Sequence, residues 1–161
     1  MWENEMYRPH TINSVLVCVD KFSDNEIYGR FYNLYLPKGV RFNGVIDLLS
    51  KLETLFDEFA FPQRYNDMRS FIINSKGELV QPTVQKREWR KQMAEEIYEQ
   101  EAGNTTTFVV EVQYRRNATW QGTVRWIDGN KTERFRSTLE LLKLMDSALN
   151  EQEEDAECRF E

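Results

Sequence analysis

The sequence predicts an α+β fold of duplicated β-β-β-α units, with antiparallel sheets that carry helices packed on one face, joined by a hairpin and a helix. The first observation is an internal repeat: sliding the chain on itself by 93 residues aligns positions 15–56 with 108–149 without a gap. The second is that identities and similar residues fall on apolar strand and helix positions. The identical pairs are Val17/Val110, Val19/Val112, Gly29/Gly122, Arg41/Arg134, Phe42/Phe135, Leu48/Leu141 and Leu49/Leu142.

The second copy of the repeat has the clearer strand pattern. Residues 108–114 alternate apolar and polar side chains in part, which is typical of a half-buried strand. The stretch 115–118 predicts a turn, since Asn117 tolerates a positive φ. Residues 119–127 alternate again, and the Asp-Gly-Asn stretch that follows predicts a tight hairpin into 131–135.

Each copy ends in a predicted helix. Ser137, with Glu140 three residues later, forms a capping-box pattern before an apolar helical stretch that reaches Leu149. In the first copy we expect strands at 15–22, 27–36 and 40–42, and a helix over 44–59 with Asn43 as its cap.

These elements divide the chain into four parts. The first β-β-β-α unit covers 12–60, a connecting hairpin and amphipathic helix cover 61–104, the second unit covers 105–150, and an acidic tail covers 151–161. Within the connection, we expect a hairpin over 70–81 and a helix over 84–101 with an apolar stripe. The basic residues of this helix precede its acidic ones, an order that opposes the helix dipole. Two interpretations remain open: the charges form a solvated face, or the basic residues form a contact patch for a partner.

Composition excludes several kinds of chemistry. The 161 residues include one His and two Cys, so a His/Cys metal cluster and a Ser-His-Asp relay with a second His are nearly excluded. Cys18 and His10 have no neighbouring catalytic partner in the sequence, and no phosphate-binding glycine loop is present. We therefore expect a protein that is not an enzyme, with no catalytic residues, no metal and no cofactor.

Net charge is concentrated at the C-terminal end. The formal charge is -6, and residues 151–161, with six acids and one base, account for -5 of it. A nearly neutral body argues against broad, salt-driven DNA binding. The acidic tail predicts a solvated, partly frayed end or, alternatively, a polyanion that meets a basic partner.

The sequence also carries a prediction of location. It shows no basic and apolar leader at its start and no apolar run near the roughly 18 residues of a membrane span. We expect a cytoplasmic protein with no membrane contact. Cys18 lies in an apolar run and Cys158 in the acidic tail, so a disulfide between them is not expected.

Aromatic residues keep a nucleic-acid function open. Trp120 and Trp126 lie on a predicted strand near Arg125 and Arg134, and exposed rings beside arginines could stack the bases of a single strand of DNA or RNA. The favoured alternative is that both indoles belong to the core, because half of each strand must be buried in such a unit.

The candidate partner-binding residues form two groups. The hairpin turn supplies Arg115, Arg116 and Asn117, with Trp120 and Gln121 beside them, and its side chains are expected to be free of packing. A dense basic cluster on the connecting helix supplies Lys86, Arg87, Arg90 and Lys91. Arginine is the better anchor, because its forked donors match carboxylates and phosphates.

One part of the chain resembles a known family. The stretch NATWQGTV at 117–124, followed by FRSTLELLKLMDSAL at 135–149, resembles a small family of largely uncharacterised bacterial proteins carried on mobile genetic elements. Part of that family is associated with inhibitors of type II CRISPR nucleases. The resemblance covers about 107–149, and the first copy has Ile27 and Asn43 where the second has Trp120 and Arg136.

The resemblance implies a function but no catalytic residue. It implies a non-enzymatic interaction protein of a mobile genetic element, an anti-CRISPR-like inhibitor that binds a host nuclease or its guide complex. The alternative is a nucleic-acid-binding accessory protein that takes single-stranded DNA or RNA. The partner could thus be a host protein or a ribonucleoprotein, and the sequence does not determine the oligomeric state.

Overall fold

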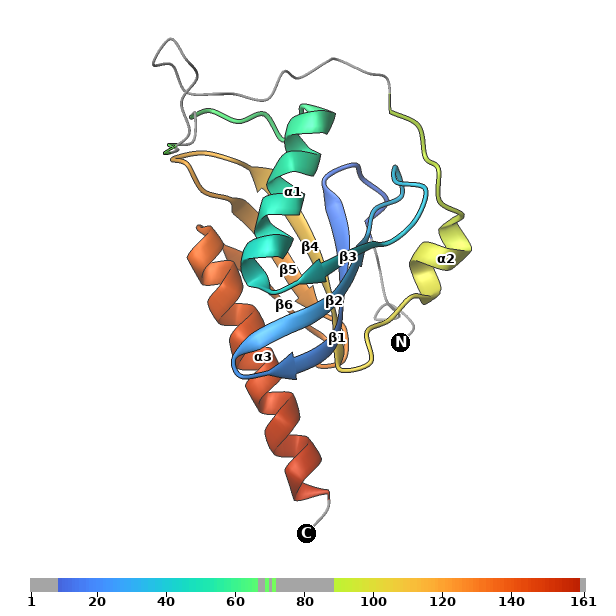
Figure 1. The fold of residues 1–161 in the computed structure, drawn as a ribbon, viewed down its shortest axis with the longest axis vertical. Helices are drawn as coiled ribbons and strands as arrows, with labels where there is room; N and C mark the ends of the chain where they lie inside the picture. Colours follow the sequence, from blue (N-terminus) through green and yellow to red (C-terminus); the bar gives the residue numbers. More distant parts are fainter. Residues whose placement is uncertain (1–8, 67–68, 70, 72–88, 160–161) are drawn as a thin grey trace.

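The computed structural model describes residues 9–66, 69, 71 and 89–159. All six strands of this part form one antiparallel sheet in the order β3-β2-β1-β4-β5-β6 (Figure 1). The strands are β1 (Ser14–Ser23), β2 (Glu26–Tyr32), β3 (Val40–Asn43), β4 (Thr106–Tyr114), β5 (Gln121–Trp126) and β6 (Lys131–Phe135). The helices are α1 (Val45–Phe59), α2 (Glu95–Gln100) and α3 (Thr138–Cys158).

The α+β class is confirmed, but the prediction of separate sheets is wrong. Strands β1 and β4 pair at the centre, with Val17 opposite Phe108, and join both β-β-β-α segments into one sheet. The physical reason is burial. Val15 to Val19 are all fully buried, so β1 has apolar side chains on both faces of the sheet, and other elements must cover both faces. A strand of this kind is unsuited to a sheet edge.

The helices α1 and α3 cover the same face of the sheet (Figure 1), and the main core lies between them and the strands. It contains Phe31 and Phe42 from one half and Phe108 and Phe135 from the other. A smaller cluster on the opposite face includes Leu16 and is covered by the segment around α2. Both faces at the centre of the sheet are therefore packed.

The connecting helix is shorter than predicted. It begins at Glu95, so Trp89 and Met93 precede it. The backbone N–H groups of Gln92 and Met93 donate to the carbonyl of Leu34 at 2.8 and 3.1 Å, which joins this stretch to the turn after β2 instead of to a helical turn. The predicted hairpin over 70–81 and the helix residues 84–88 lie outside the described residues, apart from Phe71.

The two long helices begin differently. Ser137 caps α3 as predicted, because its hydroxyl accepts the Glu140 N–H at 3.1 Å. Asn43 does not cap α1. Gly44 takes that position with a φ of 96°, a conformation that suits glycine, and the Glu26 carboxylate on β2 accepts the N–H of Val45, the first residue of the helix, at 2.6 Å.

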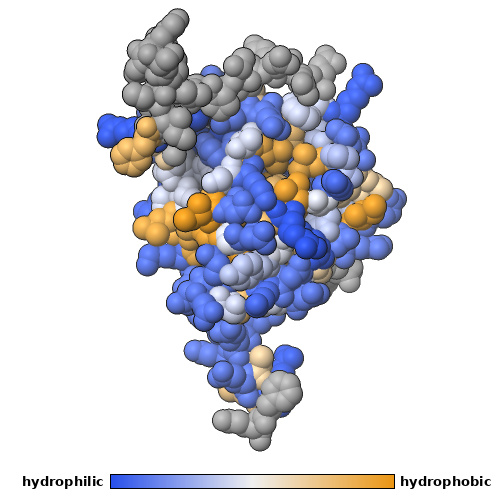
Figure 2. Space-filling view, viewed as in Figure 1, coloured by the Kyte–Doolittle hydropathy of each residue, from blue (hydrophilic) through white to orange (hydrophobic). Residues whose placement is uncertain are grey.

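The acidic tail continues α3 as far as Cys158, and residues 151 and 153–158 are exposed, which agrees with a solvated end. This end of α3 projects beyond the sheet (Figure 1), and its surface is largely hydrophilic (Figure 2). Cys18 is buried, Cys158 is exposed, and neither forms a disulfide. Among the described residues, no helix is both long and apolar enough to cross a membrane.

Candidate functional site

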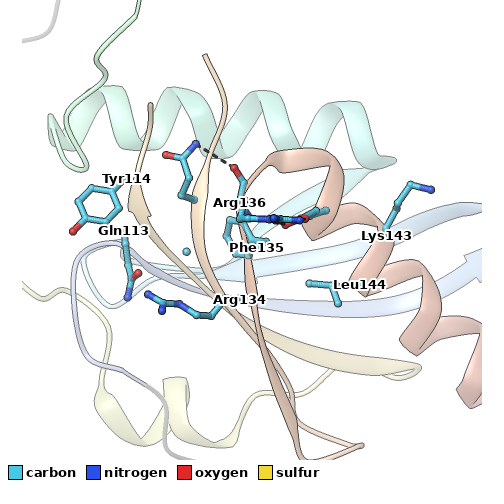
Figure 3. A pocket seen from close by; sticks show the side chains of 10 residues that line it. Gln113, Tyr114, Arg134, Phe135, Arg136, Lys143 and Leu144 are labelled. Carbon is cyan, nitrogen blue, oxygen red and sulfur yellow. Dashed lines mark hydrogen bonds and ion pairs between the residues drawn. The ribbon is translucent and has the colours of Figure 1, made fainter. Parts of the chain in front are cut away.

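A cavity of about 720 Å³ lies at one edge of the sheet, where β6 leads into α3. We call it the edge cavity. Figure 3 shows Gln113, Tyr114 and Arg134 on one side of the strands, and Lys143 and Leu144 on the side of α3. Its lining residues are Gln113, Tyr114, Gln121, Gly122, Arg134, Phe135, Arg136, Glu140, Lys143 and Leu144.

The cations of the edge cavity differ in their pairing. The Arg136 guanidinium donates to Glu140 from Nη2 at 2.5 Å and from Nε at 2.9 Å. These hydrogen bonds, with one from the Arg136 N–H, lower the pKa of the Glu140 carboxyl. Arg134 and Lys143 are exposed and form no ion pair with any other described residue. Two positive charges at the cavity thus remain available to an anionic group.

An aromatic stack borders the edge cavity. The guanidinium carbon of Arg116 lies 4.5 Å from the centre of the Tyr114 ring and 5.1 Å from that of Tyr65. Both rings are exposed, at 48% and 62%. Cation–π attraction holds such a side chain in one orientation while its N–H groups stay accessible. We call these three residues the tyrosine–arginine stack.

Gln121 fixes the hairpin turn beneath this stack. Its side-chain oxygen accepts the Arg116 N–H at 3.0 Å, and its nitrogen donates to the Arg116 carbonyl at 2.9 Å. The same nitrogen reaches the carbonyl of Arg136 at 3.4 Å. Gln121 therefore has a positioning role and joins the hairpin to the start of α3.

Arg115 is buried, which corrects the expectation that its side chain is free of packing. It is 3% exposed, and its Nη1 donates to Asp57 at 2.7 Å and to Glu53 at 3.0 Å. Its Nε donates to the carbonyl of Pro62 at 2.7 Å. A residue with these contacts joins α1 and the loop after it to the β4–β5 hairpin, and it presents little surface to a partner.

Trp120 is also packed. It is 4% exposed, meets Phe56 edge to face and donates its indole N–H to Glu53 at 2.5 Å. The core interpretation of Trp120 is therefore confirmed. Trp126 is partly buried against the main core, with its indole N–H donating to the Thr106 hydroxyl at 2.9 Å. Neither indole offers the shared stacking surface considered from the sequence.

The remaining sequence-derived candidates are scattered. Asn117 lies in the exposed turn with a φ of 57°, as predicted for a turn residue. Arg90 and Lys91 are exposed, and Lys91 forms an ion pair with Glu95 at 3.4 Å. Lys86 and Arg87 lie outside the described residues. Of the nine candidates, Gln121 lines the edge cavity, Arg116 contacts the Tyr114 ring that also lines it, and Asn117 follows Arg116 in the turn.

The edge cavity is suited to binding. Its charged groups are one carboxylate, which is already paired, and three cations, and Tyr114 adds a phenol. Elsewhere, His10 Nε2 contacts Glu99 at 2.5 Å, and no group of three or more His, Cys, Asp and Glu in the described part of the chain could hold a metal ion. Guanidinium and ammonium groups beside exposed rings are suited to carboxylates or phosphates.

Sequence reasoning missed several residues of this surface. Tyr65 comes from the loop after α1, where the Arg64 and Arg115 backbones pair in an isolated bridge, and no sequence pattern connects it to the hairpin. The strand pattern over 108–114 includes Tyr114 but indicates no binding role for it. Arg136 and Lys143 belong to the stretch that carries the family resemblance, which was the available indication.

Comparisons of this chain with protein-family models, with curated proteins and with solved structures give no match.

Proposed function

We propose that this chain is a non-enzymatic interaction protein, which binds a partner through the edge cavity and the tyrosine–arginine stack. The observation that carries the proposal is the contact of Arg116 with two exposed tyrosine rings, of which Tyr114 lines the same cavity as Arg134 and Lys143, two cations with no ion pair among the described residues. Tyrosine and arginine are enriched at binding hot spots, because both bury much surface and keep a polar end.

The partner that we propose is a host nuclease or its guide complex, so that the chain acts as an anti-CRISPR-like inhibitor. This part rests on the resemblance of residues 107–149 to proteins of mobile genetic elements. The charge of the edge cavity agrees with it, because both an acidic protein surface and a guide RNA backbone would present anions to Arg134 and Lys143.

The test is inhibition of DNA cleavage by a purified type II CRISPR nuclease loaded with guide RNA. We expect the full chain to inhibit, and Arg116→Ala and Arg134→Ala each to raise the half-inhibitory concentration at least about tenfold, a loss of about 1.4 kcal/mol. Arg41→Ala is the matched control, because Arg41 is an exposed arginine on the opposite edge strand β3. It should inhibit as the unchanged chain does.

Two results would count against this proposal. If the full chain at high excess leaves cleavage unchanged, the nuclease is not its partner. If inhibition occurs but Arg116→Ala, Arg134→Ala and Arg41→Ala behave alike, the edge cavity and the stack are not the binding surface. Thermal unfolding of each variant shows whether it is folded, since exposed substitutions usually cost less than about 0.5 kcal/mol.

The alternative function is binding of single-stranded DNA or RNA. The specific observation in its favour is that exposed tyrosine rings lie beside cations, a combination that stacks bases and neutralises phosphates. A titration against single-stranded and duplex DNA at two salt concentrations tests it. Tight binding whose affinity falls steeply with salt would favour this alternative over recognition of a protein.

We also propose that the two β-β-β-α segments arose by duplication. Glycines at equivalent repeat positions support this: a Cβ on Gly29 would lie 1.9 Å from the Cys18 carbonyl, and one on Gly122 would lie 1.9 Å from that of Glu111. Cys18 and Glu111 are themselves 93 residues apart. Superposing the backbone of residues 15–56 on that of residues 108–149 tests the proposal, and poor agreement of the two backbones would contradict it.

A further inference from the structure

The two edge strands of the sheet are protected unequally. On β3, the Lys51 side chain donates to the Arg41 carbonyl at 2.7 Å, and Asp47 accepts the Asn43 N–H at 2.9 Å. Lys51 and Asp47 also pair with each other at 3.0 Å. Helix α1 therefore supplies two side chains that occupy outward-facing backbone groups of β3, and this edge is closed to another strand.

On β6, only half of this arrangement is present. Glu140 accepts the Arg136 N–H at 2.7 Å, as Asp47 accepts that of Asn43. Four residues after Glu140, where α1 has Lys51, α3 has Leu144, which has no polar group to donate. The Arg134 carbonyl therefore lacks the bond that the Arg41 carbonyl receives.

The open groups of β6 follow from the alternation of an antiparallel ladder. Since the Arg136 N–H faces away from β5, the N–H and C=O groups of Thr132 and Arg134 face the same way. Within the described part of the chain, no hydrogen bond reaches these outward groups. β6 thus presents two residues with unpaired backbone donors and acceptors.

Two neighbouring cavities, which we together call the groove, border this open edge. The edge cavity shares Leu144 with a second cavity of about 210 Å³, which lies between β6 and α3. Val124, Trp126 and Ala148 are among the residues that line the second cavity. The two cavities together border β6 from its hairpin end to the start of α3.

The two ends of the groove differ in charge. At the edge-cavity end, Arg134 and Lys143 lack ion pairs among the described residues. At the other end the lining includes apolar side chains, and the Lys131 ammonium is paired with Glu151 at 3.4 Å. The complementary occupant has a carboxylate for the cationic end and an apolar side chain for the second cavity.

We propose that an extended segment of a partner protein, acidic at one end, adds to β6 as a seventh strand. Its backbone bonds the outward N–H and C=O groups of Thr132 and Arg134, its apolar side chain enters the second cavity, and its acidic end meets Arg134 and Lys143. Strand addition of this kind draws affinity from main-chain bonds and specificity from alternate side chains. The inference rests on the proposed function and specifies how the partner is held.

The test is selection from a displayed library of random eight-residue peptides against the full chain. We expect enrichment of β-branched and apolar residues with Asp or Glu near one end. In hydrogen exchange, a selected peptide should protect the amides of Thr132 and Arg134. Thr132→Pro removes an outward N–H at an edge, where proline is tolerated, and should weaken binding at least about tenfold. The matched control Arg41→Pro, on β3, should leave binding unchanged.

A second variant makes the test independent of proline. Arg134→Glu combined with Lys143→Glu should reverse the preference, so that peptides with a lysine end bind better than those with an acidic end. Strand addition is overturned if selection recovers no common pattern, if Thr132→Pro and Arg41→Pro weaken peptide binding equally, or if the double variant keeps the acidic preference. If the unchanged chain self-associates and Thr132→Pro abolishes that self-association, the occupant of the β6 edge is a second copy of the chain. This result would overturn the proposal of a partner peptide.

The nuclease assay separates this inference from the proposed function. If Thr132→Pro inhibits cleavage as well as the unchanged chain does while Arg116→Ala does not, the binding surface stands and strand addition is wrong. If neither variant differs from the unchanged chain in that assay, the proposed surface fails together with the inference that rests on it.

Discussion

Replacement of Arg115 by methionine should destabilise the fold far more than the same change at its neighbour Arg116. Methionine keeps much of the apolar stem and removes the guanidinium, which is 3% exposed and donates to Asp57, Glu53 and the Pro62 carbonyl. The Asp57 carboxylate, itself in a residue 7% exposed, would then lose its closest cation and keep only the longer ion pair with Arg64 at 3.6 Å.

The expected magnitude follows from this burial. Breaking a buried ion pair by removing one partner costs about 3–5 kcal/mol, because the remaining charge stays desolvated. In a chain of this size, 1 kcal/mol lowers the unfolding temperature by about 2–4 °C, so Arg115→Met should lower it by roughly 6–20 °C. Arg116→Met loses two exposed cation–π contacts, with Tyr114 and Tyr65, and should cost about 1–2 kcal/mol at most.

Urea unfolding and calorimetry of both variants measure these values. The double variant Arg115→Met with Asp57→Leu provides the internal control, since it removes both charges of the 2.7 Å pair and should recover part of the loss, while Glu53 and Arg64 each lose one ion-pair partner. A cost below about 1 kcal/mol for Arg115→Met, or equal costs at Arg115 and Arg116, would refute the conclusion that Arg115 is a structural residue.

Three further predictions concern other parts of the fold. Ser137→Ala removes the cap of α3 and should cost about 1 kcal/mol in urea unfolding. Gly122→Ala places a Cβ 1.9 Å from the Glu111 carbonyl and should cost roughly 1–3 kcal/mol or prevent folding, as seen by circular dichroism. Burial raises the pKa of the Asp20 carboxyl. The hydrogen bonds that it accepts from Arg30 and from the Asn104 N–H together lower that pKa by a larger amount, so the net shift is downward. The ionised Asp20 carboxylate therefore stabilises the fold above the unfolded pKa of about 3.9, and this contribution is lost as the pH falls through the lower pKa of the folded state. Asp20→Asn should flatten the acid side of a profile of unfolding free energy against pH.

The hairpin turn illustrates how far the sequence predicts a candidate site. Asn117 marks the turn by its residue type, and Gln121 and Arg116 lie where a surface role is expected. Arg115 precedes Arg116 and has the same chemistry, yet one is buried and the other exposed. That difference depends on Asp57 and Glu53, which lie about sixty residues earlier on α1, so no local pattern contains it.

The sequence by itself determined the local elements of this protein. Alternating apolar residues produced the strands, Ser137 produced the start of α3, and the near absence of His and Cys limited the chemistry. These properties are local, because periodicity and capping act within a few residues.

Only the tertiary structure decided how the elements meet. It joined β1 to β4 in one sheet, brought Tyr65 to Arg116, and left β6 open where Lys51 closes β3. The physical reason is that long-range contacts depend on which apolar surfaces pack against each other and which charges pair. Both are properties of the whole packed molecule and not of a local stretch of sequence.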